Sequence, residues 1–190
     1  MLLVVGGHAR KIGKTAVVTE LIAHLPEMRW TAIKITQHDP GPVAGYSIFE
    51  EPQPNQESDT GRYLLAGAPR AYWIEAGDGQ LGAAVPRVRN ILQTSEHAII
   101  ESNGILEFIR PNLYLVVLDF AARDFKPRSA EYVDRANAFV VIDRGVARPS
   151  WTGVPGAVWR TKPRFVVKPP AFSCPELVDF VKTRALGALE

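Results

Sequence analysis

The start of the chain constrains its fold more than any other part of the sequence. Residues 2–5 are an apolar run, Leu-Leu-Val-Val, followed by a glycine-bounded basic stretch that closes on Gly13-Lys14-Thr15. This ending is the second half of a P-loop, whose backbone N–H groups surround a phosphate. The lysine of a P-loop reaches the β- and γ-phosphates, and the threonine hydroxyl holds Mg²⁺. A helix beginning at Lys14 would point the positive end of its dipole at the same anion.

The full motif places its first glycine where this chain has His8, whereas Gly6 and Gly7 come two positions and one position earlier. A histidine fits there if the backbone angles suit a residue with a side chain. The alternative is an ordinary strand–loop–helix turn with a solvated basic loop. The apolar helical periodicity after Thr15 favours the phosphate site. The predicted nucleotide-binding residues are Gly7, His8, Lys11, Ile12, Gly13, Lys14, Thr15 and Ala16.

Composition limits the class of protein. A chain of 190 residues with 46% hydrophobic and 22% charged residues is typical of one globular domain, taken as 1–190. The net charge of +2 is too small to indicate a nucleic-acid partner by itself. We find no apolar run of the roughly 20 residues that span a membrane and no secretory signal. A single cysteine, Cys174, excludes an internal disulfide. A cytoplasmic location is the simplest expectation.

Short β-rich runs alternate with helical patterns along the chain, which predicts an α/β fold of the P-loop NTPase kind, with a mainly parallel sheet flanked by helices. The fully apolar runs near residues 98–100, 113–118 and 138–142 indicate strands buried on both faces. The strands are predicted at 2–6, 30–35, 71–75, 97–101, 113–118 and 138–142, and the helices at 14–25, 59–66, 79–93, 129–135 and 174–187.

Two segments interrupt this alternation. Residues 37–57 contain four prolines and no apolar periodicity, so we expect a mobile loop at the carboxyl edge of the sheet that closes over bound phosphates. Residues 145–172 are rich in proline and tryptophan. We interpret them as an irregular segment that covers a sheet edge, and the alternative is a basic aromatic surface for a nucleic acid or a protein partner.

Acidic residues follow several of the predicted strands. Glu101 ends the run at 97–100 and precedes the turn Ser-Asn-Gly at 102–104, where an acid can orient Mg²⁺ or the attacking water. Asp119 and Asp143 end later strands and could equally be helix caps or contacts to a base. We therefore predict that Glu101 is the principal acid of the site.

The long loop also brings charged residues near the expected phosphates. Asp39 and Asp59 lie at its two ends, and Asp59 is either a helix cap or a metal ligand. Lys34 is either a cation near the phosphates or a surface lysine. His8 and His38 lack the spacing of a zinc site. An Asn-Lys-x-Asp motif is absent from the sequence, so the preference between GTP and ATP stays open.

The order of these motifs resembles that of the molybdopterin-guanine dinucleotide biosynthesis adapter proteins, P-loop proteins of the SIMIBI class. After the Gly-Lys-Thr at 13–15, the similar stretches are Ala-Ile-Lys-Ile-Thr-Gln-His-Asp at 32–39, Asp-Thr-Gly-Arg-Tyr at 59–63, Ala-Gly-Ala at 66–68 and Ile-Ile-Glu at 99–101. The resemblance covers about residues 2–118.

The resemblance implies an accessory protein of molybdenum cofactor maturation that binds GTP or ATP and hydrolyses it weakly with Mg²⁺. Lys14, Asp59 and Glu101 would be the catalytic residues, and Thr15, Asp59 and Glu101 would hold the metal. The implied partners are the nucleotide and a molybdenum cofactor biosynthesis protein, and a homodimer stays open.

Two other functions stay open. Residues 101–104 are similar to the glutamate–glycine turn of dethiobiotin synthetases, which would make the chain a small-molecule kinase or an ATP-dependent ligase. An atypical P-loop with His8 would also suit a binding module that does not hydrolyse its nucleotide.

Overall fold

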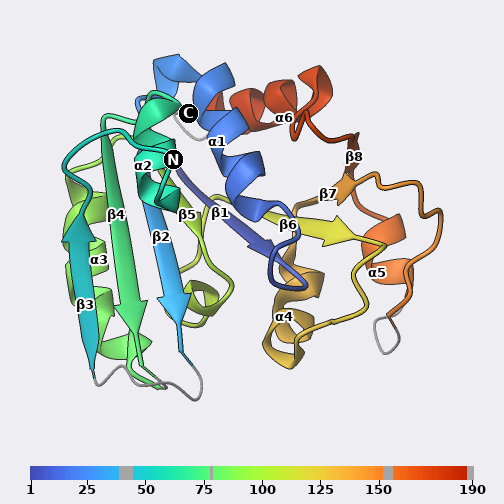
Figure 1. Ribbon diagram of the computed structural model, residues 1–190, viewed down its shortest axis with the longest axis horizontal. Coiled ribbons are helices and arrows are strands. Elements are labelled where there is room, and N and C mark those ends of the chain that lie inside the picture. Colours follow the sequence, from blue (N-terminus) through green and yellow to red (C-terminus); the bar gives the residue numbers. More distant parts are fainter. Residues whose placement is uncertain (39–44, 78, 152–155, 188–190) are drawn as a thin grey trace.

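The computed structural model describes residues 1–38, 45–77, 79–151 and 156–187, without the side chains at positions 128, 159 and 186. One eight-stranded sheet runs through the molecule (Figure 1). Its strands are β1 (Leu2–Gly7), β2 (Thr31–Gln37), β3 (Tyr46–Glu50), β4 (Arg70–Ala76), β5 (Ala98–Glu101), β6 (Leu113–Asp119), β7 (Ala138–Ile142) and β8 (Arg164–Val167).

The strand order is β3-β4-β2-β5-β1-β6-β7-β8. All neighbouring pairs are parallel except β3 and β4, which are antiparallel. The predicted α/β fold with a mainly parallel sheet is therefore confirmed. The strand β1 lies between β5 and β6, so the segments that follow these three strands meet at the carboxyl edge of the sheet, where open α/β sheets bind ligands.

Helices cover both faces of the sheet, as the apolar strands require. They are α1 (Lys14–His24), α2 (Asp59–Leu65), α3 (Leu81–Gln93), α4 (Pro127–Tyr132), α5 (Gly156–Arg160) and α6 (Pro175–Leu186), with 3-10 turns η1 (Pro26–Met28), η2 (Gly104–Glu107) and η3 (Val133–Arg135).

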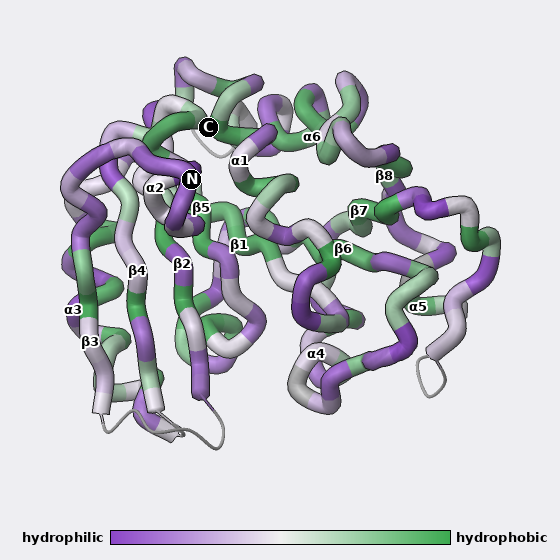
Figure 2. Tube along the Cα trace, viewed as in Figure 1, coloured by the Kyte–Doolittle hydropathy of each residue, from purple (hydrophilic) through white to green (hydrophobic). Residues whose placement is uncertain are grey.

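Two hydrophobic cores lie on the two sides of the sheet. In one, α1, α2 and α6 pack against side chains such as Leu3 and Val5 of β1. In the other, α3, η2, η3 and α5 pack against the alternate side chains, such as Val4. The tube is hydrophobic over most of β6 and β7 and hydrophilic at the loop between β1 and α1 (Figure 2). This loop is thus the polar end of a buried strand.

The structure corrects the two segments that were expected to be irregular. Residues 46–50, within the predicted loop 37–57, form β3, an exposed edge strand paired with β4. Residues 145–172 contain α5 and the edge strand β8. In the part of the chain that the structure describes, no helix combines the length and the apolar character that crossing a bilayer requires.

Candidate functional site

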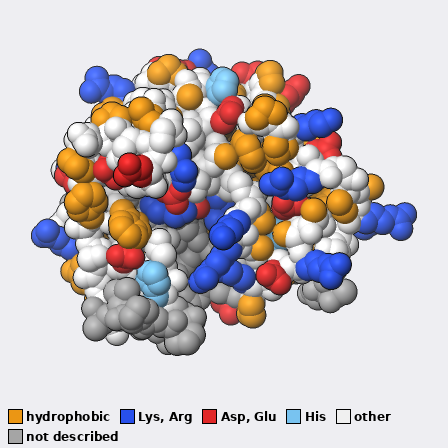
Figure 3. Space-filling model, in the orientation of Figure 1, with side chains coloured by type: hydrophobic (Ala, Val, Ile, Leu, Met, Phe, Trp, Pro, Cys, Tyr) orange, Lys and Arg blue, Asp and Glu red, His pale blue; other side chains and the backbone are white. Residues whose placement is uncertain are grey.

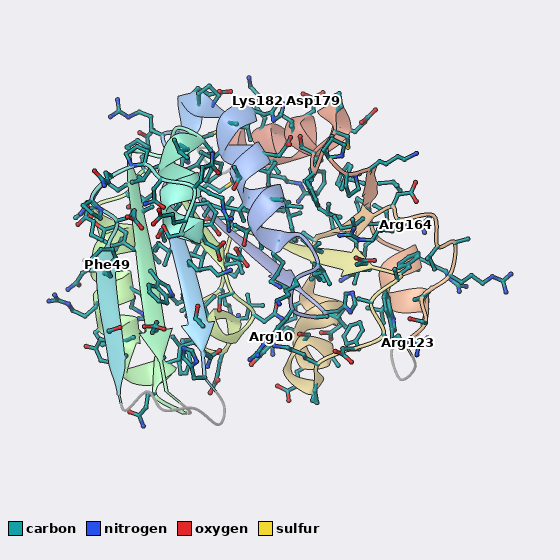
Figure 4. All side chains as sticks on the ribbon, in the orientation of Figure 1. Arg10, Phe49, Arg123, Arg164, Asp179 and Lys182 are labelled. Carbon is teal, nitrogen blue, oxygen red and sulfur yellow. The ribbon has the colours of Figure 1, made fainter. Side chains whose placement is uncertain are left out.

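The loop between β1 and α1 has the sharply turned backbone expected of a phosphate-binding loop. α1 begins at Lys14, and Gly13 before it has a φ of 97°, in the left-handed region that glycine adopts at no steric cost. Lys11 also has a positive φ, of 57°. Figure 3 shows Lys and Arg side chains gathered near the middle of this face, and Figure 4 places Arg10 there. The loop therefore presents a helix N-terminus among positive charges, which suits an anion.

Lys14 lies folded back over this loop. Its Nζ donates a hydrogen bond of 2.7 Å to the backbone carbonyl of Ala9. Burial lowers the pKa of Lys14 to about 8, against the opposing effect of Glu101, which raises it. A bound anion at the loop would stabilise the charged form of this desolvated ammonium, so the geometry suits a phosphate group.

The start of the loop is clamped by residues from distant parts of the chain. The Asn103 side chain accepts from the backbone N–H of Gly7 at 3.0 Å and donates to its carbonyl at 2.8 Å. Ser129 Oγ donates to the same carbonyl at 3.0 Å. A Cβ on Gly6 would lie 2.0 Å from Asn103 Oδ1, so any larger residue here would displace the Asn103 side chain. The sequence indicated a turn at 102–104 but gave no sign of this clamp.

His8 replaces the first glycine of the motif without strain, because it is not among the described residues with positive φ. Its ring is fully buried and contacts Asp124 O through Nδ1 at 2.7 Å. Its Nε2 accepts the backbone N–H of Asp119 at 3.0 Å, and Trp151 packs on the ring with 4.4 Å between centroids. Burial lowers the His8 pKa. The side chain thus anchors the loop from behind, and only the backbone of His8 is left to face a ligand.

Glu101 is the buried acid beside the loop. It ends β5 next to β1, in register with Val5, and is 3% exposed. Its Oε2 accepts hydrogen bonds from Thr15 Oγ1 at 2.8 Å and from the Tyr63 hydroxyl at 2.6 Å. Burial, and then the charge of Glu101, raise the pKa of Tyr63 well above its ordinary value. Tyr63 therefore remains a hydrogen-bond donor that fixes the carboxylate next to the helix start.

Lys34 joins Glu101 to Asp59. Its Nζ forms an ion pair with Glu101 Oε1 and another, of 3.1 Å, with Asp59 Oδ2. It also lies 3.4 Å from Thr15 Oγ1. Asp59 pairs in addition with Arg62. Burial would raise the pKa of Asp59, but Lys34 and Arg62 outweigh it and lower this pKa, so Asp59 is a carboxylate. Lys34 is thus part of the site and not a surface lysine.

The structure brings side-chain oxygen atoms of Thr15, Asp59 and Glu101 around one point, the ammonium of Lys34, and the metal site itself stays a prediction. One hydroxyl and two carboxylates are oxygen ligands of the kind that Mg²⁺ takes. Among the described side chains, no group of three or more His, Cys, Asp and Glu residues could hold a metal by itself. The donor set therefore fits Mg²⁺ that also takes water and phosphate oxygens, as is usual for this ion.

The other candidate acids do not join this cluster. Asp119 accepts from the backbone N–H of Ala121 and pairs with Arg144 at 2.7 Å. Asp143 accepts from the backbone N–H of Gly145. Asp39 lies outside the described residues. Asp119 and Asp143 therefore serve as local turn and ion-pair residues.

The sequence prediction did not include Tyr63 in the site, and it left Lys34 open. Each carries a weak signal in retrospect. Lys34 is a charge between the buried Ile33 and Ile35 of a parallel strand. Tyr63 follows Asp59 by four positions and so lies on the same face of α2. The helix cap that was considered for Asp59 is supplied instead by Ser58, which accepts from the backbone N–H of Gly61.

Similarity to known proteins is confined to structure, because no family model and no curated protein matches the sequence. HypB from Helicobacter pylori, described in complex with nickel, matches with a TM-score of 0.54 and 14% identity over 97% of this chain and 85% of HypB. LpxK from Aquifex aeolicus, in complex with ATP, matches with a TM-score of 0.50 and 18% identity over 87% of this chain.

The signal recognition particle receptor FtsY from Elizabethkingia anophelis matches with a TM-score of 0.50 and 14% identity over 97% of this chain. The chain spans 53% of the LpxK structure and 65% of the FtsY structure. At these identities the matches carry the fold alone. The chain has a P-loop NTPase-like α/β fold that is similar to the folds of HypB and FtsY.

Proposed function

We propose that this protein binds a nucleoside triphosphate, GTP or ATP, at the loop formed by residues 8–16, and hydrolyses it weakly with Mg²⁺. The observation that carries the proposal is the hydrogen bond between Thr15 Oγ1, at the start of α1, and the buried Glu101 at the end of β5. It joins a helix N-terminus that suits phosphate to an acid that suits a metal or water. Among the proteins of similar fold, the LpxK structure contains ATP.

Different residues would bind the phosphates, hold the metal and orient the water. The backbone N–H groups of residues 9–16 and the ammonium of Lys14 bind and orient the phosphates, and Lys14 exchanges its bond to the Ala9 carbonyl for a phosphate oxygen. Thr15, Asp59 and Glu101 would hold Mg²⁺, which neutralises phosphate charge when bound. Glu101, kept in place by the Tyr63 hydroxyl, orients the attacking water.

A narrower role, that of an accessory protein in molybdenum cofactor biosynthesis, rests on the sequence resemblance and on none of the structural matches. A molybdenum cofactor biosynthesis protein as partner and a homodimer belong to that narrower role. We place nucleotide binding first because the contacts around Thr15 and Glu101 support it directly.

Isothermal titration of ATP and GTP against the wild type and Lys14→Ala tests the proposal. Loss of a charge-assisted hydrogen bond of about 1.5–3 kcal/mol should weaken binding by about 10- to 150-fold. Lys182→Ala is a matched control, because it also removes a lysine. Lys182 belongs to α6, pairs with Glu27, and lies far from Arg10 of the phosphate-binding loop (Figure 4). Equal affinities in all three proteins, or no binding of either nucleotide to the wild type, would overturn the assignment.

A further inference from the structure

The ammonium of Lys34 lies at the centre of the predicted metal ligands. It contacts Glu101 Oε1, Asp59 Oδ2 and Thr15 Oγ1. These residues are the same three that would hold Mg²⁺. An ammonium group has three N–H donors, and in this site three oxygen atoms surround it. The cation position of the cluster is therefore filled by a side chain of the protein itself.

The backbone places Lys34 there. Lys34 is aligned with Glu101 in the parallel pairing of β2 with β5. Its neighbours Ile33 and Ile35 point to the opposite face of the sheet and are buried in the core that α3 covers. Because side chains alternate along a strand, this register directs Lys34 to the face on which α1 and α2 lie. The Lys34 side chain is only 18% exposed, so it is a built part of the site.

We propose that Lys34 is an internal cation that competes with Mg²⁺ for Thr15, Asp59 and Glu101, so that the nucleotide-free protein binds divalent ions weakly. Mg²⁺ then enters together with the nucleotide, whose phosphates supply the further ligands and the negative charge. This inference deepens the proposed function, since it rests on the same three metal ligands, but it concerns the protein without nucleotide.

The charges of the cluster support this competition. Glu101 and Asp59 face three cations: Lys34, Arg62, which pairs with Asp59, and Lys14, whose ammonium feels the charge of both carboxylates. A divalent ion added beside Lys34 would leave a surplus of positive charge in a site where Glu101 is almost fully buried. Burial makes such a surplus more costly than it would be in water. Removal of Lys34 takes away the one cation that contacts both carboxylates and leaves them with Lys14 and Arg62, so the surplus disappears.

The test is the binding of Mn²⁺, as a paramagnetic substitute for Mg²⁺, to the nucleotide-free protein. Electron paramagnetic resonance counts the free ion directly. Lys34→Met, which keeps most of the side-chain volume, should bind Mn²⁺ at least tenfold more tightly than the wild type. Lys182→Met is the matched control and should bind as the wild type does. Glu101→Gln in the Lys34→Met background should cancel the gain, which assigns it to this site.

A second measurement covers the case in which Lys34→Met is unstable. Mg²⁺ alone should raise the Tm of Lys34→Met and restore its fold, while the Tm of the wild type stays unchanged. Lys34→Gln, whose amide still donates a hydrogen bond to Glu101, should show the same gain in smaller measure. Equal Mn²⁺ affinity in the wild type and both variants, or micromolar Mn²⁺ binding to the nucleotide-free wild type, would overturn the proposal. Neither measurement depends on nucleotide binding, so a failure of the Lys34 proposal is distinguishable from a failure of the proposed function.

Discussion

Replacement of Tyr63 by phenylalanine should destabilise the protein through one hydrogen bond. The Tyr63 ring is fully buried, and its hydroxyl donates to Glu101 Oε2 at 2.6 Å. Tyr63→Phe keeps the ring packing and removes a bond to a charged, buried acceptor, which contributes about 1.5–3 kcal/mol to stability. At about 2–4 °C per kcal/mol for a chain of this size, we expect the Tm to fall by roughly 3–12 °C.

Urea unfolding followed by circular dichroism measures this loss, and Tyr114→Phe is its control. Tyr114 is also buried, but its hydroxyl lies 3.4 Å from a neutral acceptor, Asn103 Oδ1. Its removal should cost clearly less than that of the Tyr63 hydroxyl. In a Glu101→Gln background, where the acceptor is neutral, the cost of Tyr63→Phe should also fall. Equal losses for Tyr63→Phe and Tyr114→Phe would refute the view that the Tyr63 hydroxyl stabilises a buried carboxylate.

Glu101→Gln should preserve triphosphate affinity and slow turnover at least about tenfold in a phosphate-release assay, which corresponds to about 1.4 kcal/mol of barrier. Unchanged turnover would show that another acid orients the attacking water. Gly6→Ala would place a Cβ 2.0 Å from Asn103 Oδ1, so urea unfolding should show a loss of about 1–3 kcal/mol, and an unaltered midpoint would contradict the clamp. Burial lowers the pKa of His8, so the unfolded chain binds this proton more readily and stability should fall as the pH drops below about 6.5. His8→Gln should reduce that dependence, and an identical pH profile in the variant would exclude His8 as its source.

The elements with a strong local pattern were predictable from the sequence. The apolar strands β6 and β7 and the helices α1 and α6 were all predicted within one or two residues of their observed bounds. Each of these segments has a hydrophobic pattern that identifies it locally: a continuous apolar run for a strand buried on both faces, and a helical period for an amphipathic helix. Helix α1 was predicted to begin at Lys14, and it does.

The two edge strands were missed for a physical reason. β3 has the sequence Tyr-Ser-Ile-Phe-Glu and is largely exposed, so it has neither an apolar run nor a clear alternation. Its existence depends on pairing with β4, where Phe49 faces Trp73. β8 similarly depends on pairing with β7. Such tertiary pairing is decided by the rest of the sheet and is weakly encoded in the segment itself.

Some residues of the candidate site were predictable from the sequence and others were not. Lys14, Thr15 and Glu101 were predictable because a motif and a strand end mark them. The clamp of Asn103 and Ser129 on Gly7 was not, because it joins residues 96 and 122 positions apart in the chain. Contacts over such separations follow from the strand order, in which β1 lies between β5 and β6.

The most direct measurement of nucleotide binding at the loop after β1 is a titration of the ¹⁵N-labelled protein with ATP and with GTP, followed by amide chemical shifts. Backbone N–H groups at a helix N-terminus respond strongly to a bound anion because they donate to it. We expect the largest shifts at the amides of residues 9–16, with smaller changes at Glu101 and Lys34. Unchanged shifts at residues 9–16 with both nucleotides, or large shifts confined to other parts of the sheet, would contradict a phosphate site at this loop.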